Sequence, residues 1–193
     1  MKQIYFDNSA TTSIKSEVLN EMMPFLTTQY GNPSSLYTIG RKSKKAIENA
    51  RKQVAELMNC DSKEIYFTAG GSESNNIALK AFAYANKDKG NHIITSKIEH
   101  SSILETCRYL QTQGFEVSYI NVDEQGFIKL DELQQSIKQS TIMISVMSAN
   151  NEIGTIQPIE EIAKIAHNHN IVFHTDAVQA IGNMAIDVRK IGI

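Results

Sequence analysis

Runs of residues typical of strands alternate with longer runs typical of helices along most of this chain. The strand-like runs cover residues 92–96, 116–120, 141–146 and 171–174. The run at 141–146 shows little alternation of polar and apolar residues, as expected of a strand covered on both faces. The pattern predicts an α/β fold with a mostly parallel sheet and helices on both faces.

The segments between these runs carry helical periodicity and recognisable helix ends. In the segment 35–58 the periodicity predicts that Ile47, Ala50, Val54 and Leu57 face inward. Ser102 and Glu105 have the spacing of a capping box. The expected helices run from Ser13 to just before Gly31, over residues 35–58, onward from Gly71, from Ser102 to Gly114, over residues 130–137, and onward from Pro158.

The segment Ile65–Leu79 joins a β-prone run to a helical pattern through two glycines. We expect a short strand at residues 65–67 and a turn at Gly70 and Gly71, where the missing side chains let a ligand approach the backbone. Ser72 is expected to cap the helix. The first N–H groups of the helix, at the positive end of its dipole, would then form a site for a phosphate or another anion. The segment taken alone also fits an ordinary strand-to-helix turn.

Composition excludes several classes of function. The 193 residues are 41% hydrophobic and 21% charged, values typical of a globular protein, and the formal net charge of −2 argues against a general affinity for nucleic acid or anionic membrane. Nothing has the apolar length of a membrane span, and residues 1–12 lack the apolar core of a signal peptide. A cytoplasmic location is the expectation.

The cysteines and the paired histidines indicate neither a disulfide framework nor a metal site. Cys60 and Cys107 lack metal-ligand spacing, and Cys107 falls on the helical stripe of Ile103 and Leu110, which favours a packing role. His167 and His169 fall at the end of a predicted helix with no cysteine or acidic residue nearby in sequence. We expect no metal.

Four polar groups come directly after predicted strands or open the following helix. Ligands bind at the carboxyl ends of the strands of such sheets, so these groups are expected to share one site. They are Gly71–Ser72, His100, Asn150–Asn151 and Asp176–Gln179. Taken singly, each has a simpler explanation as a turn, cap or surface residue.

Together the four groups match the chemistry of pyridoxal 5′-phosphate. The glycine turn would bind the phosphate and His100 could stack on the ring. Asp176 would pair with a protonated ring nitrogen, while Asn151 and Gln179 could donate or accept hydrogen bonds at ring substituents.

Six segments resemble, in order, the motifs of the cysteine desulfurases, which belong to the class V aminotransferase group of pyridoxal-phosphate enzymes. The resemblance covers essentially the whole chain. The segments are Asp7–Thr12, Gly31–Ser35, Phe67–Asn76, Glu99–His100, Asn150–Gly154 and His174–Gln179.

The resemblance implies a role for each candidate residue and a fold-type I large domain. It implies phosphate contacts from Gly71 and Ser72, ring stacking and proton handling by His100, and a ring-nitrogen partner in Asp176. It also implies cofactor contacts from Asn151 and Gln179.

The same resemblance implies a substrate and partners. Such enzymes are homodimers that take sulfur from L-cysteine and leave L-alanine. They hold the sulfur as a persulfide for an acceptor protein in iron–sulfur cluster assembly, or for tRNA thiolation.

The sequence departs from the family pattern in one respect. The Schiff-base lysine of the family lies in a Ser-x-His-Lys motif, which residues 1–193 do not contain. Lys190 matches no part of that motif and is expected on the surface, and neither Cys60 nor Cys107 corresponds to the persulfide cysteine. We expect residues 1–193 to comprise an N-terminal segment and an incomplete cofactor-binding large domain, without the C-terminal small domain. By themselves they would be a poorly stable and inactive fragment.

Three interpretations remain open. The first is the N-terminal half of a cysteine desulfurase. The second is a related enzyme of the group, such as a selenocysteine lyase or an aminotransferase. The third is a non-catalytic chain, including one half of a split enzyme that needs a separate partner.

Overall fold

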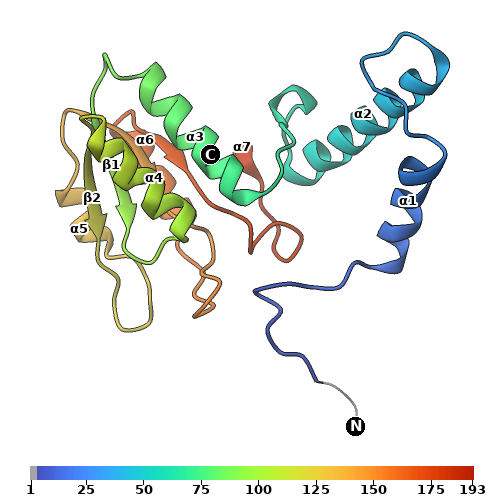
Figure 1. The fold of residues 1–193 in the computed structure, drawn as a ribbon. Helices are drawn as coiled ribbons and strands as arrows, with labels where there is room; N and C mark the ends of the chain where they lie inside the picture. The colour runs from blue at the N-terminus through green and yellow to red at the C-terminus, as the bar shows by residue number, and fades with distance from the viewer. Residues whose placement is uncertain (1–3) are drawn as a thin grey trace. The chain divides into compact units, whose positions relative to one another are not determined.

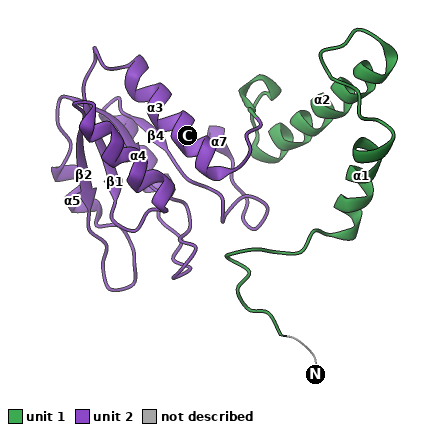
Figure 2. Ribbon diagram, viewed as in Figure 1, with its two compact units in different colours: residues 1–66 green, residues 67–193 purple. Residues whose placement is uncertain are grey.

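A computed structural model describes residues 4–193, whose contacts separate into two compact units (Figure 2). The first unit covers residues 1–66 and the second covers residues 67–193. The first contains α1 (Ser16–Thr27), α2 (Thr38–Met58) and the short 3-10 helix η1 (Ser62–Glu64). The second contains the sheet and all the remaining helices of the described chain.

The second unit is built on a parallel sheet of four strands in the order β2-β1-β3-β4 (Figure 1). All four predicted strands are confirmed, two of them to the residue. The strands are β1 (His92–Ser96), β2 (Glu116–Ile120), β3 (Thr141–Ser145) and β4 (Val172–His174).

The register of the strands brings their carboxyl ends to one edge of the sheet. Ser96 pairs with Ile120 at the end of β2, and the neighbouring Thr95 pairs with Ser145 at the end of β3. Ser145 in turn pairs with His174 at the end of β4. The loops that leave these strands therefore start close together.

Helices cover both faces of the sheet, as the unbroken apolar strands predict. On one face Ile93 packs in a cluster with Leu79 and Ile103 of two neighbouring helices, and on the other Ile94 packs with residues of two further helices. Successive residues of β1 thus face opposite cores. The helices are α3 (Gly71–Ala85) and α4 (Ser101–Thr112) on the first face, and α5 (Leu130–Gln135) and α6 (Ile159–Asn168) on the second.

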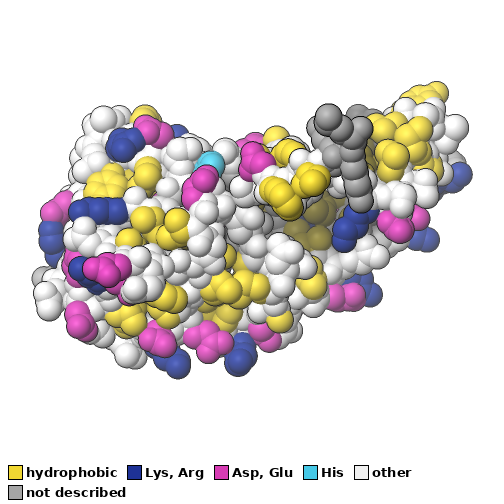
Figure 3. Space-filling model, turned by 90° about the horizontal axis from the view of Figure 1, so that it is seen from below, with side chains coloured by type: hydrophobic (Ala, Val, Ile, Leu, Met, Phe, Trp, Pro, Cys, Tyr) yellow, Lys and Arg dark blue, Asp and Glu magenta, His cyan; other side chains and the backbone are white. Residues whose placement is uncertain are grey.

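The first unit leaves much apolar surface open. No residue of α1 is buried, and its Val18, Met22 and Phe25 are all exposed. In α2 the predicted inward face is wrong: Leu57 is 61% exposed, and Ile47 and Ala50 are exposed as well. Periodicity defines an apolar stripe on a helix, but it does not say whether another element covers that stripe. Exposed apolar side chains are visible in yellow in Figure 3.

The short strand predicted at residues 65–67 is absent from the described chain. Ile65 instead follows η1 and accepts a hydrogen bond from Arg51, while Tyr66 and Phe67 are 82% and 53% exposed. A β-prone run becomes a strand only where a neighbouring strand pairs with it, and the sheet of the described chain consists of β1 to β4. One helix that the sequence pattern did not predict, α7 (Val188–Ile191), follows β4.

None of the helices within residues 4–193 combines the length and apolar character needed to cross a membrane.

Candidate cofactor site

The first turn of α3 provides free backbone donors at the carboxyl edge of the sheet. The N-cap is Gly70, and Ser72 is the second helical residue, so the expectation that Ser72 caps the helix is wrong. The first N–H groups of a helix lack intrahelical acceptors, and Gly70 has no side chain that could accept from them. Glu73 instead reaches back and accepts from the N–H of Ala69 at 2.5 Å.

A close contact places this helix end against the turn that follows β4. A Cβ atom at Gly71 would lie 2.7 Å from Cγ2 of Val178, so a larger residue would require the Val178 side chain to move. A Cβ at Gly70 would meet open space. The start of α3 is therefore open at Gly70 and packed at Gly71. The packed residue contacts Val178, which lies two residues after Asp176.

Asp176 follows β4 and is held in one orientation by its neighbours. Its side chain accepts from the N–H of Val178 at 3.0 Å through Oδ1 and from Nδ2 of Asn75 at 2.8 Å through Oδ2. Its backbone carbonyl accepts from the N–H of Ser148 at 2.9 Å. The residue is 8% exposed. Each carboxylate oxygen keeps a further lone pair that can accept a proton donor.

His100 is the N-cap of α4 and is exposed. Its Nδ1 accepts from the backbone N–H of Ser102 at 3.2 Å, so the imidazole caps the helix. The capping box predicted for Ser102 and Glu105 is therefore wrong, and Glu105 pairs with Arg108 instead. The spacing fitted, but the helix begins two residues earlier than a cap at Ser102 would require.

Glu99, next to His100, is a buried acid that the sequence reasoning did not single out as functional. It accepts from Ser96 Oγ at 2.5 Å and from the N–H of Met147 at 3.1 Å, which joins the ends of β1 and β3. Burial raises the pKa of Glu99 to about 7, against hydrogen bonds from Ser96 and Met147 that lower it. An acid between a strand end and a candidate histidine was the available signal.

The loop after β3 separates the roles of two adjacent asparagines. Asn150 is buried; its Nδ2 donates to the carbonyl of Ile98 at 2.9 Å and its Oδ1 accepts from the N–H groups of Glu152 and Ile153. Asn151 is half-buried and donates to Glu152 at 2.7 Å. Asn150 therefore anchors the loop beside the segment that carries His100, and Asn151 is the one with a side chain able to exchange partners.

Gln179 is half-buried on the turn that begins at Asp176. Its backbone carbonyl accepts from Nδ2 of Asn183 at 3.1 Å. Gly71 packs against Val178 on the turn of Asp176, and hydrogen bonds lead from Asp176 through Asn75 and Ser102 to His100. The positions of Asn151 and Gln179 follow from the chain, next to Asn150 and three residues after Asp176.

Asn75 is a further polar residue that sequence reasoning missed. It lies on α3 and is 4% exposed. It occupies the same buried stripe as Leu79 and Ala83, four and eight residues on. That spacing was the available signal, because a polar side chain on a buried stripe requires hydrogen-bond partners.

Two other groups near the site have pKa values shifted by burial. Burial lowers the pKa of His174, which bonds to Ser145 Oγ at 2.9 Å, to about 4. Burial raises the pKa of the Cys107 thiol to about 12. Cys107 is fully buried on the stripe of Ile103 and Leu110, so the predicted packing role is confirmed.

Comparison with known proteins shows the family of this chain. The family model described as aminotransferase class-V matches residues 4–193, and the chain belongs to this family.

Curated relatives show which members of the family the chain is similar to. "Cysteine desulfurase IscS" of Methanosarcina thermophila is 56% identical over 192 residues, which are 100% of this chain and 48% of the relative. The protein of the same name from Clostridium botulinum (strain Kyoto / Type A2) has the same identity and coverage. The chain spans about half the length of the curated relatives it matches.

Solved structures give the same result for the fold. A "NIFS-LIKE PROTEIN" matches with a TM-score of 0.96 and 40% identity, covering 100% of this chain and 53% of that one. "SspA in complex with cysteine" matches with a TM-score of 0.94 and 39% identity, covering 98% of this chain and 55% of that one. The resemblance to the cysteine desulfurases and the predicted α/β class are both confirmed.

Proposed function

We propose that the full-length protein is a pyridoxal-phosphate-dependent cysteine desulfurase. It would take sulfur from L-cysteine, transfer it to a cysteine thiolate as a persulfide, and leave L-alanine. Relatives named cysteine desulfurase support this reaction. The observation that carries the proposal is the contact between Gly71 and Val178, because it sets the anion-binding end of α3 against the turn of Asp176.

The residues at this edge fit the cofactor in charge and in hydrogen-bonding type. The cofactor's phosphate needs donors, which the first turn of α3 and the exposed Ser72 hydroxyl would supply. A protonated ring nitrogen needs an acceptor, and the buried Asp176 carboxylate has lone pairs left over. The amides of Asn151 and Gln179 would serve the ring substituents, as the resemblance implies.

The cofactor, when bound, supplies an electron sink for bond changes at the substrate amino acid. The chain's own residues then have separate tasks. Asp176 would provide a carboxylate oxygen as the acceptor for a protonated ring nitrogen, and burial would strengthen that interaction. His100 would lie against the ring and hold a proton at Nε2, ready to donate it.

The proposed reaction also needs a Schiff-base lysine and a persulfide cysteine, which we place in the full-length protein outside residues 1–193. Lys190 is on the surface, where its Nζ lies 3.7 Å from Glu160, and the surface role predicted for it is confirmed. We therefore assign it no catalytic task and propose that residues 1–193 alone, an incomplete large domain, are inactive. A homodimer, a sulfur-acceptor protein and a cytoplasmic location complete the proposal.

The first test replaces Asp176 by alanine in the full-length protein. Loss of a charge-assisted hydrogen bond worth about 1.5–3 kcal/mol should weaken pyridoxal-phosphate binding by roughly 10- to 150-fold. Binding is measured by absorbance titration. The control is Asp123→Ala, because Asp123 also accepts backbone N–H groups in a turn, at 2.9 Å, but lies outside the proposed site. Equal binding by the two variants would remove Asp176 from the site.

The second test assays sulfide release from L-cysteine and selenide release from L-selenocysteine by the full-length protein. An excess of a thiol reductant is added, because it supplies the two electrons that release the outer sulfur of a persulfide as sulfide. Sulfide with L-alanine in equal amounts supports the desulfurase. Selenide without sulfide would favour a selenocysteine lyase. Neither product, with pyridoxal phosphate bound, would exclude both reactions and favour an aminotransferase or a non-catalytic chain.

A further inference from the structure

Both amide protons of Asn75 are used inside the proposed site. Its Nδ2 lies 2.8 Å from Oδ2 of Asp176 and 2.9 Å from Oγ of Ser102. A carboxylate can only accept, so the amide nitrogen, rather than the amide oxygen, faces Asp176. The two N–H groups of the amide therefore point to two different elements, the turn after β4 and the start of α4.

The direction of the next hydrogen bond follows from the first two. The Ser102 oxygen accepts from Asn75, so its single proton is free to point to Nδ1 of His100, which lies 2.9 Å away. The backbone N–H of Ser102 points to the same nitrogen at 3.2 Å. Since Nδ1 is an acceptor for both donors, the ring proton lies on Nε2.

We infer that Asn75 is a positioning residue that orients the Asp176 carboxylate and sets the tautomer of His100. This inference rests on the proposed function and deepens it. Through these two bonds the Asn75 amide would hold both Asp176, the acceptor for a protonated ring nitrogen, and His100, which presents an N–H to the ring or the substrate. Asn75 itself would contact neither the cofactor nor the substrate. It acts through Asp176 and Ser102.

Packing alone does not account for an amide at this position. The other members of the buried stripe, Leu79 and Ala83, are apolar and fully buried. An unpaired amide in that setting would cost free energy, whereas an apolar side chain would not. The two hydrogen bonds compensate for that cost, and both of their acceptors lie at the carboxyl edge of the sheet.

The test uses cofactor-free full-length protein with ¹⁵N-labelled histidine. Long-range ¹H–¹⁵N NMR spectra report which ring nitrogen of His100 carries the proton, and His100→Gln assigns the signal. Asn75→Ala should lower the ratio of the Nε2–H to the Nδ1–H tautomer about tenfold, the effect of one lost hydrogen bond. Ser102→Ala should act in the same direction, and Ser102→Thr, which keeps the hydroxyl, should restore the wild-type ratio.

A second measurement separates the two arms of Asn75. Pyridoxal-phosphate affinity should fall about tenfold or more in Asn75→Ala, because Asp176 loses a donor, and should stay within about twofold in Ser102→Ala. The matched control is Asn86→Ala, because Asn86 donates a similar amide bond, at 2.9 Å to Phe82, at the other end of α3. It should change neither the tautomer nor the affinity.

The inference fails if a folded Asn75→Ala protein keeps the wild-type tautomer ratio, whatever the ratio in Ser102→Ala. If Asn75→Ala does not fold, the comparison of Ser102→Ala with Ser102→Thr decides, and equal tautomer ratios in those two would overturn it. The tautomer is read without cofactor. A wild-type protein that binds no pyridoxal phosphate would therefore defeat the proposed function while leaving this result standing.

Discussion

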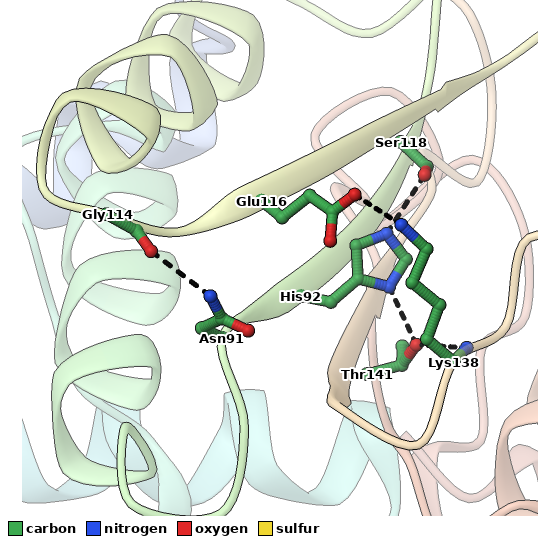
Figure 4. A network of polar contacts seen from close by, with 7 residues as sticks. All are labelled: Asn91, His92, Gly114, Glu116, Ser118, Lys138 and Thr141. Carbon is green, nitrogen blue, oxygen red and sulfur yellow. Dashed lines mark hydrogen bonds and ion pairs between the residues drawn. The ribbon is translucent and has the colours of Figure 1, made fainter.

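Two histidines stand at opposite ends of β1, and their surroundings differ. His92 begins the strand and is fully buried, with Nδ1 bonded to Thr141 Oγ1 at 2.7 Å and Nε2 to Ser118 Oγ at 2.9 Å (Figure 4). His100 follows the other end of the strand and is exposed, and its Nε2 has no hydrogen-bond partner within residues 4–193. At the amino end of the sheet both ring nitrogens of His92 have hydrogen-bond partners, while at the carboxyl end Nε2 of His100 is available for chemistry.

Hydroxyl groups hold both ring nitrogens of His92. Thr141 Oγ1 also accepts from the N–H of Lys138 at 2.8 Å. Burial lowers the pKa of His92, and the Lys138 ammonium lowers it further. Either tautomer of His92 can therefore bond at both ring nitrogens, whereas Nε2 of His100 has no hydrogen-bond partner within residues 4–193. Burial and hydrogen-bond partners, rather than residue type, separate a structural histidine from a candidate catalytic one.

The largest expected effect compares His92→Ala with His100→Ala in the full-length protein. His92→Ala should lower the free energy of unfolding by about 3–5 kcal/mol, because it leaves a cavity and removes two buried hydrogen bonds. His100→Ala should cost about 1 kcal/mol, the value of a lost helix cap, yet abolish most sulfide release. Urea titrations and the sulfide assay measure the pair. A large loss of stability in His100→Ala together with a loss of sulfide release in a stable His92→Ala protein would contradict the assigned roles of the two histidines.

His174 should make stability fall in acid. Its pKa is about 4 in the folded protein and 6.5 when unfolded. Between these values the unfolded chain binds a proton that the folded chain does not, so stability decreases as pH falls from 6.5 to 4. The loss should approach about 3 kcal/mol. Glu99 opposes this contribution above pH 4.5, so in urea titrations at several pH values His174→Asn should leave stability decreasing as pH rises. A slope unchanged from the wild type would show that the pKa of His174 is not lowered in the folded protein.

Glu99 should give the opposite slope, with a change of at most about 3 kcal/mol. Its pKa is about 7 in the folded protein and 4.5 when unfolded, so the folded chain holds the extra proton between these values. Stability should therefore decrease as pH rises from 4.5 to 7. Glu99→Gln, which stays neutral, should remove this dependence while the acid-side effect of His174 persists. A wild-type slope in Glu99→Gln would mean that the carboxyl is solvated.

The smallest effect is expected at the ion pair of Lys138 and Glu116, which lies beside His92 (Figure 4). Both side chains are about half exposed, at 44% and 53%, so water and salt screen the pair. Lys138→Met should leave the urea midpoint within experimental error at physiological salt. A clear drop would show that the ion pair, rather than the imidazole, organises the amino end of the sheet.

Much of the second unit followed from local pattern. The bounds of β1 and β2, and the stripe of Ile103, Cys107 and Leu110, were predicted because strand alternation and helical periodicity are properties of neighbouring residues. The gathering of polar groups at one edge followed from the general rule for parallel sheets. The pattern did not show that Leu57 and Ile47 are exposed, since exposure depends on segments distant in sequence.

Caps and cross-links at the site were predicted less well. Ser72 and Ser102 were both expected as helix caps, but Gly70 and His100 hold those positions. A shift of two residues separates the expected caps from the observed ones. Asn75 was overlooked because its two acceptors are 27 and 101 residues away in sequence. No local pattern reports a hydrogen bond of that range.

The sequence by itself determined the α/β class, the strands and the family, because these depend on periodicity and on motifs that are continuous in the chain. Only the tertiary structure decided that Asn75 joins Asp176 to Ser102, and that His92 is saturated while His100 keeps a free N–H. The physical reason is that burial and hydrogen-bond partners depend on residues that are distant in sequence and close only in the folded chain. They arise only when the sheet brings the ends of its strands to one edge.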